Sequence, residues 1–296
     1  MSNPQRAIRL IVNADDFGVS ARVNEGIVLS HRRGIVTATS LMAVGRAFDH
    51  AVDRLRALPS LDVGVHLTLV AEHPLRTGSS LAGPDGRFPA SAGLLLRRYL
   101  AGGIKLADVR SEWSAQIERV LGRGVSVTHL DSHQHVHVLP GIAEVCMDLA
   151  ARYGIPFVRV PCERLGMDQP PSLYGLKRLL EAASLGAFWK IARLAGVAQA
   201  NHPPLQFLGF RDGGRLNLER LRRLTAELQP GGSYELMCHP GLSPEEPDIR
   251  SWGYDHEGEL LALSRPSLRA ELTARGIRLC RFADLTIIQP RRQRRG

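Results

Sequence analysis

The sequence predicts an α/β fold, an irregular (β/α) barrel of the TIM-barrel type, from three observations. Short β-branched or apolar runs alternate with stretches in which apolar residues recur about every 3.6 positions. Seven or eight such units follow one another along the 296 residues, which suits a barrel. Titratable residues stand just after several apolar runs, where parallel strands carry reactive groups. A doubly wound open sheet is the alternative architecture.

The first half of the chain contains four predicted strands, each a short apolar or β-branched run followed by a polar turn. They are 8–13, 36–43, 61–69 and 125–130. Helical spacing of apolar residues marks the stretches 22–33, 46–57 and 106–121. Ser20 stands where the first helix needs a cap, and Gly34 stands where its end favours a left-handed residue.

The second half continues the alternation. Its predicted strands are 155–160, 205–210, 233–238 and 277–280, and its predicted helices are 141–153, 173–195, 216–228 and 259–275. Ser267 is a candidate cap, and Gly154 and Gly276 follow helix ends. No stretch resembles an interdomain linker, so residues 1–290 are expected to form a single domain. The basic tail 291–296 is expected to be disordered.

Composition narrows the choice of compartment and partner. No run approaches the roughly 20 apolar residues of a membrane span, and no signal-peptide core precedes residue 8, so a cytoplasmic protein is expected. The net charge of +9 suggests an anionic partner, although a bias toward arginine explains it equally well. Aromatic residues make up only 5% and no nucleic-acid motif is present, so we expect no nucleic acid and favour a lipid headgroup surface.

Asp15 and Asp16 directly follow the first predicted strand. Adjacent carboxylates repel each other, so the pair is costly unless a cation or a shared proton compensates. The pair therefore suggests a metal site. An ordinary surface turn is the simpler explanation of such a pair taken alone.

Four histidines fall within residues 129–137, of 11 in the whole chain. On an extended strand His133, His135 and His137 would share one face, with Asp131 hydrogen-bonding a ligand from behind. A catalytic metal site takes about three protein ligands, so some of the four are expected to be packed core histidines. As a group they favour a metal site.

His66 and His239 stand at the ends of the third and seventh predicted strands. His66 interrupts an apolar run, where an imidazole must find a partner. His239 is followed by Pro240 and Gly241, whose turn can aim the ring into a cleft. Each histidine alone is ambiguous between a core residue and a functional group.

Together these segments resemble the YdjC family of carbohydrate deacetylases over nearly the whole chain. The matching motifs, in the same order, are Leu10–Gly18, the Gly-x-His-x-x-Leu around His66, Thr128–His137 and Met237–Pro240. The resemblance implies one divalent metal ion held by Asp16, His66 and His133. It also implies Asp15 as the base and His239 as the candidate acid. Zinc suits this set, and magnesium or another divalent ion is the alternative.

The implied reaction is hydrolysis of an N-acetyl group to an amine and acetate. A cation bound by one carboxylate and two imidazoles can lower the pKa of water toward about 7, so that Asp15 can remove the proton. An amine is a poor leaving group and needs a proton donor, the role given to His239. His135 and His137 are expected either to support the metal ligands from a second layer or to contact the sugar. Arg159 and Glu235 are candidate orienting groups, or a plain salt bridge.

Relative to compact family members, the chain is expected to carry a helical insertion at about 170–204. Its apolar positions follow helical spacing beside a basic face, which indicates either a lipid-contacting lid or one more barrel helix. The apolar positions are Leu173, Leu176, Leu180, Ala187, Ile191 and Leu194, and the basic ones are Lys177, Arg178, Lys190 and Arg193. The segment resembles the hopanoid-biosynthesis-associated, HpnK-like branch of the family. That resemblance implies an N-acetylglucosaminyl hopanoid as substrate and peripheral contact with a membrane.

Three other functions remain open from the sequence. Soluble chitooligosaccharides are the nearest alternative substrate. Asp and His sites also serve metal-dependent phosphoesterases, which often use two metal ions. A catalytically silent carbohydrate-binding protein is the third alternative, because metal ligands alone do not guarantee turnover.

Overall fold

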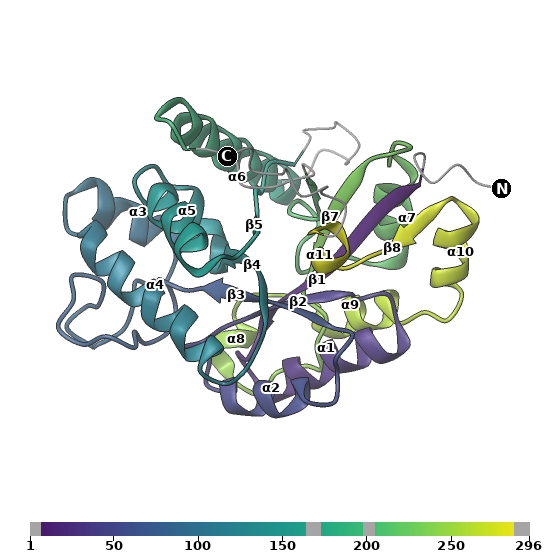
Figure 1. Cartoon of the computed structure of the whole chain (residues 1–296), viewed down its shortest axis with the longest axis horizontal. Coiled ribbons are helices and arrows are strands. Elements are labelled where there is room, and N and C mark those ends of the chain that lie inside the picture. Colours follow the sequence, from purple (N-terminus) through teal and green to yellow (C-terminus); the bar gives the residue numbers. More distant parts are fainter. Residues whose placement is uncertain (1–6, 164–172, 198–204, 287–296) are drawn as a thin grey trace, which may run out of the picture.

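The structure is a computed structural model that describes residues 7–163, 173–197 and 205–286. Eight strands form one sheet in which every pairing is parallel. They are β1 (Ile8–Phe17), β2 (Ala38–Leu41), β3 (Asp62–Leu67), β4 (Val127–Ser132), β5 (Phe157–Val158), β6 (Gln206–Leu208), β7 (Ser233–Cys238) and β8 (Ile277–Leu279). The strand order β5-β4-β3-β2-β1-β7-β6, with β8 beside β1, confirms the predicted barrel-like α/β class (Figure 1).

β1 is the centre of the sheet. One edge pairs with β7 over residues 9–14, and the other is divided between β8 beside residues 8–10 and β2 beside residues 13–17. Leu10, Ile11 and Val12 are fully buried, as expected of a strand covered on both faces.

Helices follow most strands and cover the sheet (Figure 1). They are α1 (Ala21–Arg33), α2 (Phe48–Leu55), α3 (Ala92–Leu100), α4 (Leu106–Leu121), α5 (Ile142–Tyr153), α6 (Leu173–Leu194), α7 (Leu218–Ala226), α8 (Pro247–Arg250), α9 (His256–Leu263), α10 (Leu268–Ala274) and α11 (Phe282–Thr286), with the 3-10 segment η2 at His133–Val138. Within the three described ranges, no helix is long and apolar enough to cross a membrane.

The helices differ from the predictions in two ways: one predicted helix is divided, and α3, α8 and α11 were not predicted. The single helix predicted at 259–275 is two helices, α9 and α10, because Pro266 lies between them and cannot sit inside a helix. The helix α3 was not predicted. Ser91 caps it by accepting a hydrogen bond from the Leu94 N–H at 3.4 Å.

The predicted helix ends are partly confirmed. Ser20 caps α1, and Gly154 and Gly276 are left-handed as expected. Ser267 makes no capping hydrogen bond. Gly34 is not left-handed. A Cβ there would lie 2.3 Å from the carbonyl oxygen of Leu263, so glycine instead permits close approach of the end of α1 to α9.

The sheet remains open between β5 and β6, which do not pair in the described part of the chain. Glu163 links the two ends without a strand pairing. Its carboxylate accepts the backbone N–H groups of Gly209 and Arg211, both at 2.9 Å, just beyond β6. The half-buried Glu163 side chain thereby joins the segment after β5 to the segment after β6.

Candidate metal centre

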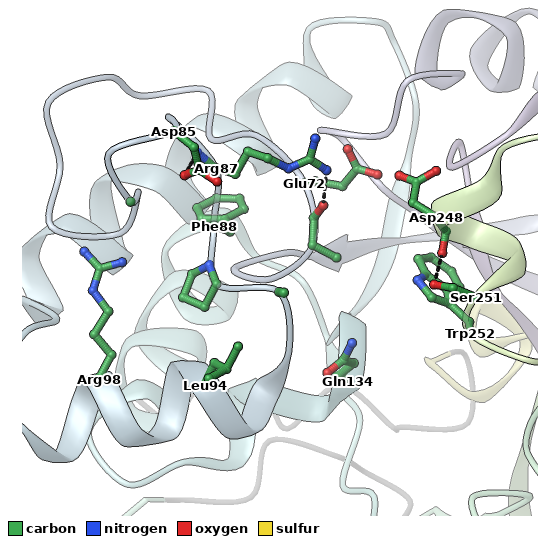
Figure 2. A pocket seen from close by; sticks show the side chains of 14 residues that line it. Glu72, Asp85, Arg87, Phe88, Leu94, Arg98, Gln134, Asp248, Ser251 and Trp252 are labelled. Carbon is green, nitrogen blue, oxygen red and sulfur yellow. Dashed lines mark hydrogen bonds between the residues drawn. The ribbon is translucent and has the colours of Figure 1, made fainter.

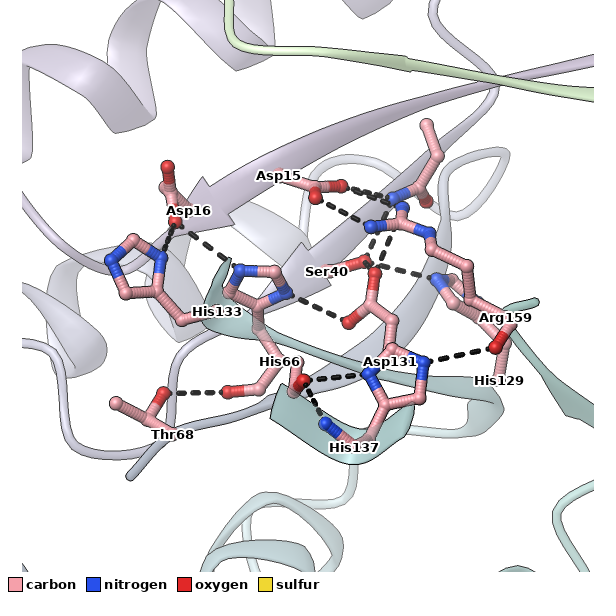
Figure 3. Close-up of polar contacts among 12 residues, drawn as sticks. Asp15, Asp16, Ser40, His66, Thr68, His129, Asp131, His133, His137 and Arg159 are labelled. Atoms are coloured by element: carbon pink, nitrogen blue, oxygen red, sulfur yellow. Dashed lines mark hydrogen bonds and ion pairs between the residues drawn. The ribbon is translucent and has the colours of Figure 1, made fainter. Parts of the chain in front are cut away.

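Titratable side chains gather at the carboxyl ends of β1, β3, β4, β5 and β7, as the barrel prediction requires (Figure 3). They are Asp15, Asp16, His66, Asp131, His133, Arg159, Glu235 and His239, each at most 6% exposed. Burial of so many ionisable groups is costly unless each is paired or holds an ion. The group is therefore a built site rather than a surface turn.

Asp15 and Asp16 both face the site although neighbouring strand residues normally point to opposite faces. The register between β1 and β2 shifts between Ala14 and Phe17, and Asp16 adopts a positive φ of 66°. This bulge costs about 1 kcal/mol for a non-glycine residue. It turns Asp15 toward Arg159 and Asp16 toward the histidines (Figure 3).

Asp16, His66 and His133 offer ligand atoms that all lie within 4.8 Å of one another. The Asp16 Oδ1 atom is 2.9 Å from His133 Nδ1 and 3.3 Å from His66 Nε2. Two strands, β1 and β3, and the turn after β4 thus bring together residues that are up to 117 positions apart in sequence.

His66 is held in one orientation by Asp131, its register partner on the adjacent strand β4. The Nδ1 atom of His66 lies 2.8 Å from Asp131 Oδ1, so Nε2 is the nitrogen that faces Asp16. Asp131 is fixed in turn by Ser40 at 2.7 Å and Arg159 at 2.8 Å. A carboxylate behind a histidine in this way is typical of metal sites.

Two buried atoms of the set have no hydrogen-bond partner among the described residues: Asp16 Oδ2 and His133 Nε2. One carboxylate oxygen and one imidazole nitrogen left unpaired in a buried site are what a cation would satisfy. One carboxylate and two imidazoles also match the ligand chemistry of catalytic zinc sites.

The charges of the site also favour a bound cation. Three carboxylates, Asp15, Asp131 and Glu235, contact the buried guanidinium of Arg159, and a fourth, Asp16, faces His66 and His133. Burial raises the pKa of Asp16, but His133 and His66 outweigh burial and hold it well below its usual value. Burial raises the pKa of Glu235 to about 7 despite Arg159. The excess of negative charge favours a bound cation.

A second set, Asp15, His66 and Asp131, also has ligand atoms within 4.8 Å of one another. Arg159 already binds both of its carboxylates, with Nη atoms 2.6 Å from Asp15 Oδ2 and 2.8 Å from Asp131 Oδ2. A cation there would compete with the guanidinium. The set around Asp16 is the better metal candidate.

His239 lies at the end of β7 with its ring against Tyr254, the ring centroids 4.6 Å apart. Its backbone N–H donates to Glu259 at 2.5 Å, and its Nδ1 atom has no partner among the described residues. Burial lowers the pKa of His239 to about 4, partly offset by Asp16 and Asp15. The ring of the free protein is therefore neutral near pH 7.

The histidines of 129–137 do not share one face, so that expectation was wrong. β4 ends at Ser132, and Gln134 and His135 have positive φ in the tight turn η2. His137 is bonded through both nitrogens, to Ser132 Oγ at 2.6 Å and to the Arg159 carbonyl at 2.9 Å. His135 instead packs against two aromatic rings, Phe207 and Phe210.

His129 is one of the packed core histidines expected in this segment. Its ring stacks on Phe282 with centroids 4.0 Å apart. Ser40 and Thr128 lie 3.1 Å and 3.0 Å from its two nitrogens. Burial lowers its pKa to about 3, so it stays neutral.

Several residues near the site were not selected from the sequence. Asn13 donates to Asp15 Oδ1 at 2.8 Å and to Ser40 Oγ at 2.7 Å. Trp252 packs on His133, with ring centroids 4.9 Å apart. A search for polar residues inside apolar strands would have found Asn13, whereas Trp252 lies in a loop with no motif around it.

A barrel-like parallel α/β fold whose strand ends hold a buried Asp-His-His set defines a class of protein, one whose site could hold a metal ion. Comparison with known proteins identifies the family. The chain belongs to the YdjC-like protein family, whose model matches residues 9–274.

Proteins with similar sequences include two that are named carbohydrate deacetylase. The one from Homo sapiens is 34% identical, covering 98% of this chain and 94% of its own length. The one from Halalkalibacterium halodurans is 42% identical, covering 80% of this chain and 87% of its own length. A crystal structure from Enterococcus faecalis, described as a candidate cellobiose-phosphate cleavage protein, matches with a TM-score of 0.68 and 25% identity over 94% of this chain and 99% of that one.

Proposed function

We propose that this protein is a metal-dependent hydrolase that removes the N-acetyl group from an amino sugar, giving the free amine and acetate. The buried set Asp16, His66 and His133 beside Asp15 is the observation that carries the proposal. The names of the relatives support the same reaction and substrate class.

Asp16, His66 and His133 would hold one divalent ion, with Asp131 fixing the His66 ring. Such an ion supplies Lewis acidity, which lowers the pKa of water and polarises the amide carbonyl. We propose zinc, because two imidazoles and one carboxylate suit zinc better than magnesium, which prefers oxygen ligands.

Asp15 takes the role of the base. Its two oxygens are gripped by Arg159 at 2.6 Å and 2.7 Å, and Asn13 adds a third hydrogen bond at 2.8 Å. This clamp keeps the carboxylate in one orientation beside His66 and Asp131, whose ligand atoms lie within 4.8 Å. A fixed carboxylate within reach of the attacking water can accept its proton.

His239 takes the role of the acid that protonates the leaving amine. Its Nδ1 atom has no partner among the described residues, which leaves a nitrogen available, and the tilted contact with the Tyr254 ring helps to hold the imidazole in place. Because burial keeps the free ring neutral, His239 must gain a proton during turnover before it can donate one.

We further propose that the sugar is lipid-linked, as on an N-acetylglucosaminyl hopanoid, and that the insertion containing α6 contacts a membrane surface. Along the outside of α6 the side chains of Leu176, Leu180, Ile191 and Leu194 are between 50% and 81% exposed. The opposite side of the helix, at Ala182, Trp189 and Ala192, is buried.

The exposed stripe of leucines and isoleucine supports the lipid-contacting lid over the alternative, one more barrel helix with its apolar side on the core. Lys177, Lys190 and Arg193 are exposed on the same helix. Exposed apolar side chains flanked by basic ones are typical of helices that lie on an anionic lipid surface.

The test is acetate release from N-acetylglucosaminyl bacteriohopane polyol and from N,N′-diacetylchitobiose, using protein stripped by EDTA and then given zinc, magnesium or no metal. We expect release only after metal is restored, with zinc most effective and with preference for the lipid-linked sugar. Preference for the soluble disaccharide would contradict the lipid linkage. Release from neither substrate with any metal would contradict the proposed function.

A further inference from the structure

A pocket of about 550 Å³ opens beside the candidate metal centre. Figure 2 shows its walls, which come from the segment 71–90 after β3, from the first turn of α3, from Gln134 and from the segment 248–252. Trp252 and Arg98 lie at opposite sides of the opening, with Gln134 and Leu94 between them (Figure 2). None of the residues so far given a chemical role lines this pocket.

The pocket is joined to the candidate metal centre by one ring contact and by one residue that follows a proposed ligand in the chain. The Trp252 ring packs on the His133 ring, with the ring centroids 4.9 Å apart. One side of the pocket wall therefore covers a proposed metal ligand. Gln134 follows His133 in the chain, and its Oε1 atom accepts the Ala92 N–H at 2.7 Å, which ties the start of α3 to the same turn. A ligand lying on Trp252 would sit next to the centre.

The charged side chains of the wall balance one another. The same pocket is lined by acidic residues Glu72, Asp85 and Asp248 and by basic residues Arg87 and Arg98. Most are already engaged: Arg46 lies 2.6 Å from Asp248 and 3.6 Å from Glu72. A wall of mixed sign attracts neither an anion nor a cation strongly, but offers hydrogen bonds to hydroxyl groups.

Apolar surface completes the wall at Trp252, Phe88 and Leu94. A pyranose ring has hydroxyl groups around its edge and C–H groups on its faces, so it fits an aromatic platform inside a ring of hydrogen-bonding groups. We propose that this pocket binds a neutral sugar ring of the substrate, stacked on Trp252. The inference rests on the proposed function, and it assigns sugar contacts to residues outside the candidate set His135, His137, Arg159 and Glu235.

The experiment measures binding of N,N′-diacetylchitobiose by calorimetry to protein kept in EDTA, so that turnover does not interfere. Trp252→Ala removes the platform and Trp252→Phe keeps an aromatic face. Leu94→Trp fills the pocket from α3 without touching His133. Leu100→Trp is the matched control, because Leu100 is exposed on the same helix but does not line the pocket.

We expect at least tenfold weaker binding for Trp252→Ala and Leu94→Trp, a smaller loss for Trp252→Phe, and no change for Leu100→Trp. Zinc affinity measured on the same proteins should be unchanged for Leu94→Trp, which separates a filled pocket from a misfolded centre. A 6-phosphorylated disaccharide that binds over tenfold tighter than the neutral one would overturn the assignment to a neutral ring.

The outcomes separate this inference from the proposed function. Wild-type affinity, or a wild-type KM with normal acetate release, in both Trp252→Ala and Leu94→Trp would overturn the pocket assignment alone. Binding that depends on Trp252 and Leu94 without any acetate release from the metal-loaded protein would support the pocket and overturn the proposed deacetylase. A wild-type protein that binds no sugar would overturn the pocket assignment.

Discussion

Asp15 and Asp16 are neighbours in sequence with different surroundings. Asp15 is clamped by Arg159 and Asn13, whereas Asp16 contacts His66 and His133 and keeps one oxygen unpaired in the described structure. The sequence indicated a metal from their repulsion but could not separate their partners, because the bulge and the positive φ of Asp16 arise only in the folded sheet.

Replacing Asp15 with asparagine tests this division. The amide cannot take up the proton, so we expect acetate release to fall by about 10²–10⁴-fold. Zinc affinity should change little, because the Asp16 set is intact. Steady-state acetate release and a zinc titration on the same preparation measure the two effects. Asp53→Asn, an exposed carboxylate paired with Arg56, is the matched control. Normal turnover in Asp15→Asn would remove Asp15 from the base role.

Residues that hydrogen-bond or pack against the proposed ligands were harder to predict from the sequence than the ligands themselves. Strand ends and histidine density marked His66, His239 and the histidines of 129–137, because both features are visible in the order of residues, and the family resemblance selected His133 among them. The partners Asn13, Ser40 and Trp252 became apparent only when the strands and the 248–252 segment were brought together. The contact of Trp252 with His133, more than a hundred positions away in the chain, leaves no local pattern.

Most elements were predictable because apolar spacing and turn residues are local signals. α4 and β7 have the predicted bounds, and α1 and α5 differ by one residue at one end. The turn η2 was not predictable as a turn. A run with histidine at alternate positions looks like a strand, but the segment folds back after Ser132 to place His133 against Asp16.

Gly26 lies where α1 packs closely against the turn that follows β7. A Cβ on Gly26 would lie 2.3 Å from the Cα atom of Gly241, in the turn that follows His239. The same turn is bonded to α1 through the Leu242 N–H and the Arg22 carbonyl at 3.1 Å. Close packing of α1 therefore helps to position the turn that carries His239.

We expect Gly26→Ala to destabilise the protein by about 1–3 kcal/mol or more, because backbone must move to admit the methyl group. Gly186→Ala is the matched control in the interior of α6, where a Cβ meets no atom within 4 Å. That change should stabilise by about 0.5–1 kcal/mol, since alanine favours helix more than glycine does. Urea unfolding of both variants gives the comparison. Equal effects of the two changes would contradict the packing argument.

The barrel class was predictable for the whole molecule, since parallel strands linked by helices have few arrangements. The open side between β5 and β6 was not predictable, because it depends on contacts such as those of Glu163 with Gly209 and Arg211. Composition also left the role of α6 undecided. Only the folded chain distinguishes its buried side from the exposed stripe at Leu176, Leu180, Ile191 and Leu194.

Stability of the whole molecule should depend on pH through Glu259, a buried carboxyl on α9. Burial raises its pKa from 4.5 to about 8, although the backbone N–H groups of His239, Leu216 and Gly214 act in the other direction. Between these values the folded protein holds a proton that the unfolded chain releases. The stabilising contribution is therefore full below about pH 4.5 and is lost as pH rises toward 8.

Glu259→Gln should accordingly flatten the fall in unfolding free energy between pH 5 and 8, by on the order of 1 kcal/mol per pH unit. Urea unfolding at several pH values measures the slope for each protein. Glu257→Gln is the control two residues away: Glu257 is exposed and its pKa is lowered by Ser243, so its charge does not change in this range. If Glu259→Gln kept the wild-type slope, a proton on Glu259 would not contribute to folding. Because the carboxyl also holds the His239 N–H, acetate release by the same variant would show whether stability and the proposed acid depend on one group.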